Sequence, residues 1–126
     1  MSRRFPILFD PWYRVLSAAL LMPPSSSYVE VSADHVYVRL SWGFRATFPR
    51  TAVVRTSLSN EHPLSRGVHG WAGKWLVNGS DEGIVVMDLE PVQRGRVTGF
   101  PVRLRRLMVS VEDPEGLRAA LDARDG

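Results

Sequence analysis

Apolar and polar residues alternate along two stretches, Tyr28–Val31 and Val36–Phe48, with the period of two that is typical of half-buried β-strands. In the first stretch Val29 and Val31 flank Glu30. In the second stretch the apolar positions of the alternation carry even numbers, and they are Val36, Val38, Leu40, Phe44, Ala46 and Phe48. The pattern predicts three consecutive strands, each with one face toward a core.

The parity of these positions restricts the two connecting turns. Val31 and Val36 share a face across a hairpin only if the loop has an even length, which Ala33–Asp34 or Ser32–His35 provides. The next two strands keep their even-numbered residues on one face only with an odd loop, and Ser41–Gly43 is three residues long. The sequence therefore predicts a meander of three antiparallel strands.

Within the second loop, we expect Gly43 to take the left-handed conformation of a three-residue hairpin and Trp42 to lie at the tip. Further apolar runs bring the predicted total to about seven strands, with a loop at Ser59–Gly70 and turns at Asn78-Gly79 and Gln93–Arg96. The further strands are Ala52–Leu58, Trp71–Val77, Ile84–Leu89, Val97–Leu104 and Leu107–Val111.

A helix is predicted near the N-terminus, from Pro11 to Met22. Asp10 before Pro11 is a strong helix start, and Pro23-Pro24 provides the stop. Its apolar side chains leave no clearly polar face, so the helix needs cover from the rest of the fold, a membrane surface or a partner subunit. The mostly apolar run within it, Val15–Met22, spans only eight residues, against about 20 for a membrane span, so we interpret it as part of the folded protein.

A second helix is predicted at the C-terminus, where Asp113-Pro114 repeats the start signal and Leu117, Ala120 and Leu121 share one face. The chain is thus organised as an N-terminal helix and linker, residues 1–27, followed by a β domain over residues 28–126 that is one folding unit. We expect a mainly β protein with flanking helices.

Composition narrows the possible chemistry. The chain has 126 residues, 44% of them hydrophobic, which suits one globular domain with a real core. It has no cysteine, which excludes thiol catalysis and Cys-ligated metals and fits a reducing cytosol. His62 and His69 match no zinc signature, and no phosphate-binding loop or nucleophile motif is present. We expect neither cofactor nor metal, and no enzymatic activity.

Charge is unevenly distributed along the sequence. The net charge is +3, and all basic residues except Lys74 are arginine, a bias that GC-rich codon usage or phosphate and carboxylate recognition would explain. Residues 91–110 contain five arginines and no acid, whereas 81–90 contain four acids and no base. The arginines either pair with these acids across strands or form a patch for phospholipid headgroups, nucleic acid or an acidic partner. They are Arg94, Arg96, Arg103, Arg105 and Arg106.

The segment Gly67–Trp75 combines glycines with His69, Trp71 and Trp75. The glycines suit tight turns and the tryptophans suit packing on the sheet, but the same residues also suit an aromatic edge that binds a ligand. His69 and Trp71 are therefore further candidate binding residues.

The order of short strands followed by an amphipathic helix is similar to the pleckstrin-homology-like (PH-like) fold, a seven-strand antiparallel barrel capped by a C-terminal helix. The segments YVEVSADHVYVRLSWGFRATFPRTAVV and LMVSVEDPEGLRAAL resemble small bacterial PH-like domains, particularly uncharacterised single-domain proteins of actinobacteria. The resemblance covers roughly Tyr28 to Arg124 and does not include the N-terminal helix. The loop Ser32–His35 holds an aspartate where phosphoinositide-binding members are basic.

These observations favour a non-catalytic binding or scaffolding module for a protein partner or an anionic membrane surface. A nucleic-acid-binding domain, and a small-ligand carrier or enzyme with an unrecognised site, are the alternatives. We expect a cytoplasmic protein, peripheral to the inner face of the membrane if it binds lipid, and the N-terminal helix is a candidate surface for homo-oligomerisation.

Overall fold

A computed structural model describes residues 2–11, 27–59 and 67–122. Within these residues nine strands form one sheet, and a single α-helix follows them. The strands are β1 (Arg3–Pro6), β2 (Ser27–Val31), β3 (His35–Leu40), β4 (Phe44–Pro49), β5 (Val53–Leu58), β6 (Gly67–Trp71), β7 (Lys74–Asn78), β8 (Ile84–Val97) and β9 (Phe100–Ser110). A 3-10 turn, η2 (Arg50–Ala52), precedes β5, and the helix is α2 (Pro114–Asp122).

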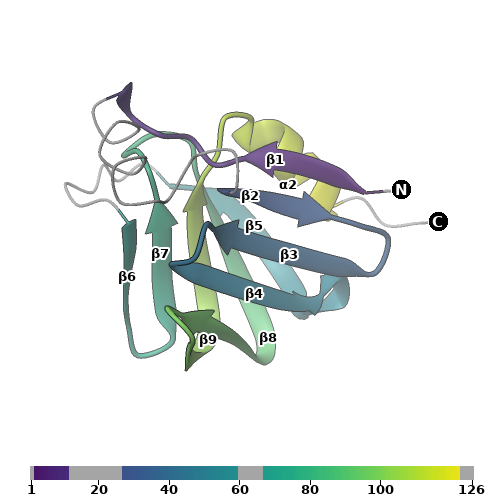
Figure 1. The fold of residues 1–126 in the computed structure, drawn as a ribbon. Helices are drawn as coiled ribbons and strands as arrows, with labels where there is room; N and C mark the ends of the chain where they lie inside the picture. The colour runs from purple at the N-terminus through teal and green to yellow at the C-terminus, as the bar shows by residue number, and fades with distance from the viewer. Residues whose placement is uncertain (1, 12–26, 60–66, 123–126) are drawn as a thin grey trace.

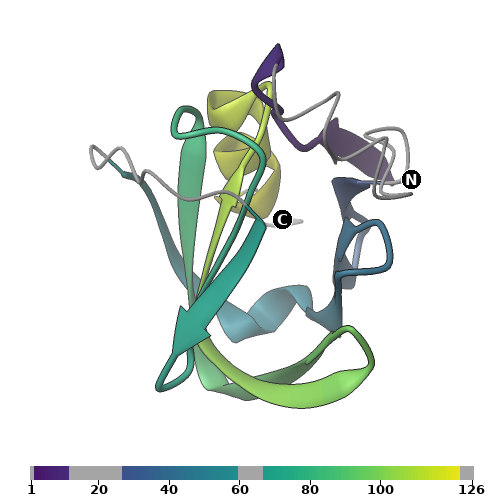
Figure 2. The same ribbon diagram turned by 60° about the vertical axis from the view of Figure 1, so that its left-hand side comes forward.

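The sheet curls on itself into a half-barrel (Figures 1 and 2). Its strand order is β1-β2-β3-β4-β8-β9-β7-β6, and β5 pairs with β8 off this path. The curl depends on the two longest strands. β8 pairs with β5 through its first half and with β4 through its second, and its register with β9 shifts between Asp88 and Gln93. Pro91 lies at this bend, where a residue without an N–H group is tolerated.

The predicted meander is confirmed in its register. Val31 lies opposite Val36, and Leu40 opposite Phe44, so the loops have the even and odd lengths that the parity requires. Trp42 lies at the tip of the second hairpin, as expected. The expectation for Gly43 is wrong: the positive φ of this loop belongs to Ser41, at 43°.

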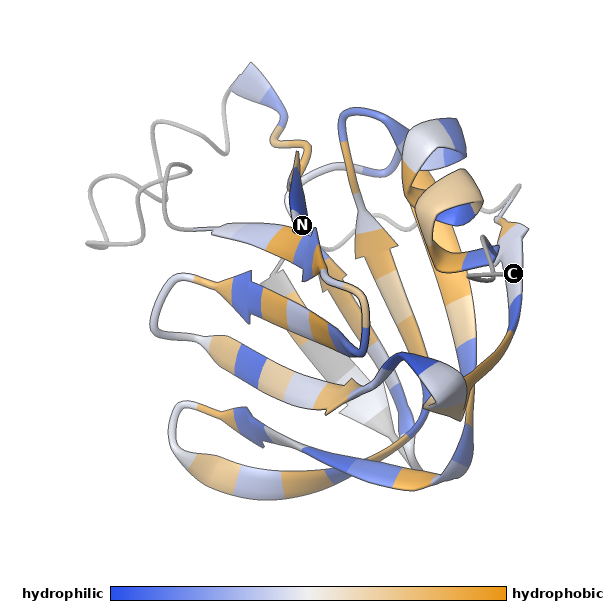
Figure 3. Ribbon diagram, turned by 90° about the vertical axis from the view of Figure 1, so that its right-hand side faces the viewer, coloured by the Kyte–Doolittle hydropathy of each residue, from blue (hydrophilic) through white to orange (hydrophobic). Residues whose placement is uncertain are grey.

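The inner face of the curl is the core. Hydrophobic and hydrophilic residues alternate along its strands (Figure 3), and the inward residues of β2, β3 and β4 are almost completely buried. α2 packs beside β5 and β8, with Leu117 and Leu121 buried and Ala120 against the core, which confirms the predicted helix and its apolar face. Asp113 caps the helix, because its Oδ1 accepts a hydrogen bond from the Gly116 N–H at 3.0 Å.

The N-terminal segment differs from the expectation. The helix predicted over residues 11–22 lies, apart from Pro11, outside the described residues. Before it, β1 extends the sheet by pairing with β2. Phe5, Ile7 and Phe9 are buried in the core, and Ile7 bridges to Val111. Residues 3–6 therefore belong to the same sheet as β2 and the later strands, and Ile7 and Phe9 continue along it through isolated bridges.

The segment Gln93–Arg96, predicted as a turn, is instead part of β8, and the turn follows at Thr98-Gly99. Gly95 is an inward strand residue here: a Cβ atom on it would lie 3.1 Å from Leu104 Cδ1. The glycine therefore favours the close approach of neighbouring strands and does not form a turn.

The strand count and pairing also need correction. The two strands predicted over residues 97–111 are the single strand β9, and the described sheet has nine strands rather than seven. The sheet is not wholly antiparallel, because β7 and β9 run parallel.

Candidate functional site

Five arginines lie on the outer face of β3, β4, β8 and β9, and we call this surface the arginine face. They are Arg39, Arg45, Arg94, Arg96 and Arg103. Each alternates with residues that point into the core: Val38 and Leu40 flank Arg39, Gly95 separates the two arginines of β8, and Leu104 follows Arg103. Because a strand sends successive side chains to opposite faces, burial of the one set fixes the outward direction of the other.

The strand register places these arginines directly opposite one another. Arg39 lies opposite Arg45, and Arg45 lies opposite Arg96, so three cations form a row across three neighbouring strands. Arg94 lies opposite Arg103 and forms a second row. Like charges in directly opposed positions destabilise a sheet. The fold therefore carries an electrostatic cost at this face.

Within the described part of the chain, none of these five arginines makes an ion pair. The Arg39 Nε donates to the Ser41 carbonyl oxygen at 3.1 Å, and an Arg96 Nη1 donates to that of Gly99 at 3.0 Å. These contacts orient two of the side chains and leave their positive charge uncompensated. Among the described residues, the five arginines thus present several N–H donors and pair with no carboxylate, which suits an anionic ligand.

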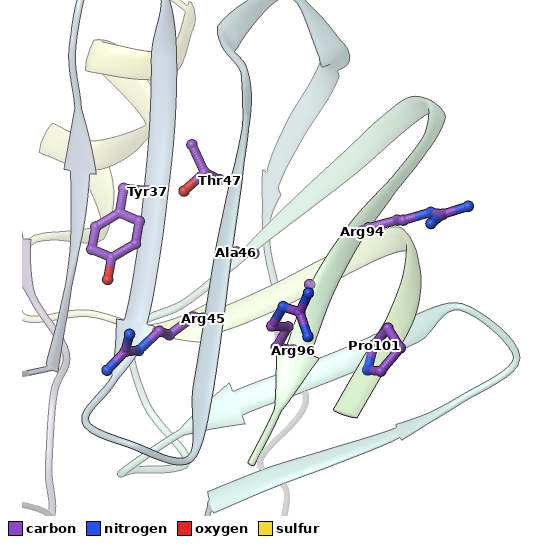
Figure 4. A pocket seen from close by; sticks show the side chains of 8 residues that line it. Tyr37, Arg45, Ala46, Thr47, Arg94, Arg96 and Pro101 are labelled. Carbon is purple, nitrogen blue, oxygen red and sulfur yellow. The ribbon is translucent and has the colours of Figure 1, made fainter. Parts of the chain in front are cut away.

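A hollow of about 420 Å³ lies on the arginine face, between β4 and the second half of β8. It is lined by Tyr37, Arg45, Ala46, Thr47, Arg94, Gly95, Arg96 and Pro101. Figure 4 shows Arg45 turned toward the side of Tyr37 and Arg94 turned the opposite way, so the guanidinium groups spread apart. This separation is what mutual repulsion favours, and it leaves room for phosphate or carboxylate groups between them.

Arginines elsewhere on the molecule have acidic partners. Asp88 accepts hydrogen bonds from Arg106 Nε at 2.7 Å and from Arg55 Nε at 3.1 Å. Burial by itself raises the pKa of the Asp88 carboxyl, but the hydrogen bonds and charges of Arg106 and Arg55 outweigh it and hold this pKa below its ordinary value. On the far edge of the sheet, Arg4 binds Glu30 at 2.7 Å. The arginine face differs from these neutralised sites.

The arginine-rich segment predicted from the sequence is divided by the structure. Arg94, Arg96 and Arg103 lie on the arginine face, whereas Arg106 is bound to Asp88, as the cross-strand alternative predicts. Arg105 donates to the Ala72 carbonyl oxygen at 3.2 Å, beside the β6–β7 hairpin. Arg105 and Arg106 both line a second hollow of about 490 Å³, whose lining also includes Asp88 and Glu90. That hollow is mixed in charge.

His69 and Trp71 lie on β6, opposite Leu76 and Lys74 of β7. β6 ends the sheet order beyond β9 and β7, so its backbone is separated from β8 by two strands. The structure does not bring these two positions to the arginine face, and their side chains lie outside what it describes.

The sequence pattern did not identify Arg39 and Arg45 as site residues, because they lie far from the arginine-rich segment 91–110. A signal for their pairing was nevertheless present: the loop of three residues that sets Leu40 opposite Phe44 also sets Arg39 opposite Arg45. The pairing of β4 with β8, which adds Arg96 to the row, has no such local signal.

Comparison with known proteins gives no relative: no family model, no curated protein and no solved structure matches this chain. Among the described residues, no group of three or more potential metal ligands gathers in one place. In the same part of the chain, no helix has the length and apolar character needed to cross a bilayer.

Proposed function

We propose that this protein is a non-catalytic binding module that uses the arginine face to dock on a negatively charged surface, that of a membrane or of an acidic protein partner. The observation that carries the proposal is the row Arg39, Arg45 and Arg96, in which like charges oppose one another without an acidic partner in the described residues. A fold keeps a destabilising arrangement of this kind when function requires it.

The contrast with the rest of the surface supports this proposal. The carboxylates of Asp88 and Glu30 neutralise arginines on other parts of the sheet, so the chain has acids available for ion pairs. An ordinary solvated face would mix the two signs. A face of one sign raises the local concentration of anionic partners and speeds their association.

The fold suits such a role, and we propose that it is a divergent member of the PH-like class. A curled antiparallel meander and a capping C-terminal helix support that assignment. The additional strands β1 and β6 and the parallel pairing of β7 with β9 are departures from the seven-strand plan.

The proposal is tested by binding to heparin, a sulfated polyanion, over a range of salt concentrations. An arginine near an anionic surface contributes about 1 kcal/mol, so Arg45→Gln with Arg96→Gln should cost about 2 kcal/mol, or roughly 30-fold in Kd. A matched control, Arg3→Gln with Lys74→Gln, removes the same charge from two exposed residues away from the arginine face.

We expect the wild-type protein to bind heparin with an affinity that falls as salt rises, and the control to bind nearly as well. The proposal is wrong if the wild type does not bind at low salt. It is also wrong if the two double variants lose affinity equally, because net charge alone would then explain the binding.

A further inference from the structure

Two aromatic side chains project from neighbouring hairpin tips at one end of the arginine face. Trp42, in the β3–β4 loop, is 51% exposed, and Phe100, directly after the β8–β9 turn, is 73% exposed. Phe100 is the most exposed of the large apolar residues in the described part of the chain. Single exposed apolar residues are common on protein surfaces, but two large aromatic side chains at one edge form an apolar patch of the kind that marks interaction sites.

The two tips are held together. The Thr98 N–H donates to the Gly43 carbonyl oxygen at 3.0 Å, and Phe44 lies opposite Val97 where the two hairpins meet. Figure 2 shows the β3–β4 and β8–β9 hairpins side by side, with the β6–β7 hairpin on the other side of the curl. The tips therefore form one protruding edge with a fixed geometry.

The first row of arginines lies directly behind this edge. Arg39 and Arg45 stand two residues from the ends of their loop, and Arg96 stands two residues before Thr98. Two residues of strand span about 7 Å, which is the depth to which peripheral segments bury an apolar face at a membrane surface. The second row, Arg94 and Arg103, lies farther from the tips along the same strands.

Acidic residues lie away from this edge. Asp34 belongs to the loop at the opposite end of β3, and Asp81 and Glu82 precede β8, whose far end leads to the tip. Glu30, two residues along β2 from the residue opposite Arg39, is bound to Arg4. An aromatic tip followed by arginines that have no ion pair within the described residues complements a bilayer whose surface is anionic and whose headgroup layer accommodates aromatic rings.

We infer that the two hairpin tips and the arginine face form one docking surface for an anionic phospholipid bilayer. Trp42 and Phe100 enter the headgroup layer, where the tryptophan ring places its apolar body inward and its N–H among polar groups. The row of Arg39, Arg45 and Arg96 binds lipid phosphates. This inference rests on the proposed function and identifies the anionic surface as lipid.

The test is co-sedimentation of the full chain with phosphatidylcholine vesicles that contain phosphatidylglycerol, compared with vesicles of phosphatidylcholine alone. The tip variant is Trp42→Ser with Phe100→Ser, which removes no charge. Its matched control is Val54→Ser with Leu58→Ser, two exposed apolar residues of β5, 46% and 41% exposed.

We expect wild type and control to bind the phosphatidylglycerol vesicles and not the neutral ones. The tip variant should bind them at least about tenfold more weakly, since it loses two apolar side chains that the bilayer would bury. Its affinity for heparin should be unchanged. A tip variant that sediments like the wild type overturns the inference.

A wild-type protein that binds heparin but no vesicle also overturns the inference, and it leaves the arginine face to an acidic protein or a nucleic acid. A wild-type protein that does not bind heparin would instead refute the proposed function. Tryptophan emission gives a second measurement: vesicles should shift the wild-type emission to shorter wavelength, and Trp42→Phe should abolish most of that shift while retaining vesicle binding. A shift that persists in Trp42→Phe contradicts insertion of this residue.

Discussion

Replacement of Arg45 by glutamine should make the protein more stable and at the same time weaken its binding to anions. Arg45 is the middle member of the row and lies opposite both Arg39 and Arg96. One substitution therefore removes two like-charge contacts, whereas glutamine keeps a polar side chain of similar length on the exposed face.

The expected gain in the free energy of unfolding follows from the opposed positions of the arginines on neighbouring strands. Two unit charges about 6–8 Å apart in water repel by about 0.5–0.7 kcal/mol, so the loss of two such contacts should raise the free energy of unfolding by about 1 kcal/mol. For a domain of this size that corresponds to a rise in Tm of about 4 °C. Arg45→Lys is the control, because it keeps the charge at the same position and changes only the shape of the side chain.

Thermal unfolding followed by circular dichroism, at low salt and at 1 M salt, measures the effect. At 1 M the screening length is about 3 Å, so the advantage of Arg45→Gln over Arg45→Lys should disappear. If the two variants have the same Tm at low salt, repulsion among Arg39, Arg45 and Arg96 does not destabilise the fold. If the advantage persists at high salt, its cause is not charge. Either result would remove the main argument for a functional face.

Three further predictions concern the scaffold. Leu121→Asp should lower the free energy of unfolding by about 3 kcal/mol or more, because it places a carboxylate in the core; an unchanged urea midpoint would contradict the packing of α2. Asp113→Ala should cost about 1 kcal/mol through loss of the helix cap, and a variant of wild-type stability would contradict that capping role. The pKa of Asp88 is lowered in the folded protein, so its stabilising effect is complete above the ordinary aspartate pKa of about 3.9 and is lost as the pH falls through the folded value. Asp88→Asn should therefore reduce stability at neutral pH and flatten its decline in acid, and an acid titration with the wild-type slope would contradict the ion pairs.

Local patterns allowed part of the fold to be predicted. The alternation from Tyr28 to Phe48 determined which residues face the core, and parity then determined the loop lengths and the pairing of Leu40 with Phe44. The second helix was predictable because Asp113-Pro114 and the Leu117/Leu121 face are signals within one segment.

Pairing between distant segments was not predictable in this way. Nothing in residues 74–78 indicates a parallel partner at 106–109, and β1 has only four residues with one buried side chain. Gly95 between two arginines resembled a turn, although its role is to let neighbouring strands approach closely. A glycine serves both purposes, and only tertiary contacts distinguish them.

The residues of the candidate site also fall into those that local sequence indicated and those that only strand pairing brought together. Arg94, Arg96 and Arg103 stood out because basic residues are concentrated in that part of the sequence. Arg39 and Arg45 joined them only through the β4–β8 pairing, and Arg106 left the set because Asp88 lies opposite it on β8. Charge density in a sequence thus indicated a patch, but strand pairing decided its members.

NMR can locate anion binding on the arginine face residue by residue. A ¹⁵N-labelled sample of the full chain would be titrated with a short heparin fragment, and the shifts of its backbone amides followed. We expect the largest changes to be confined to two segments, Arg39–Thr47 and Arg94–Arg103. Changes centred on Gly67–Lys74 or on α2, or spread evenly over the chain, would contradict it.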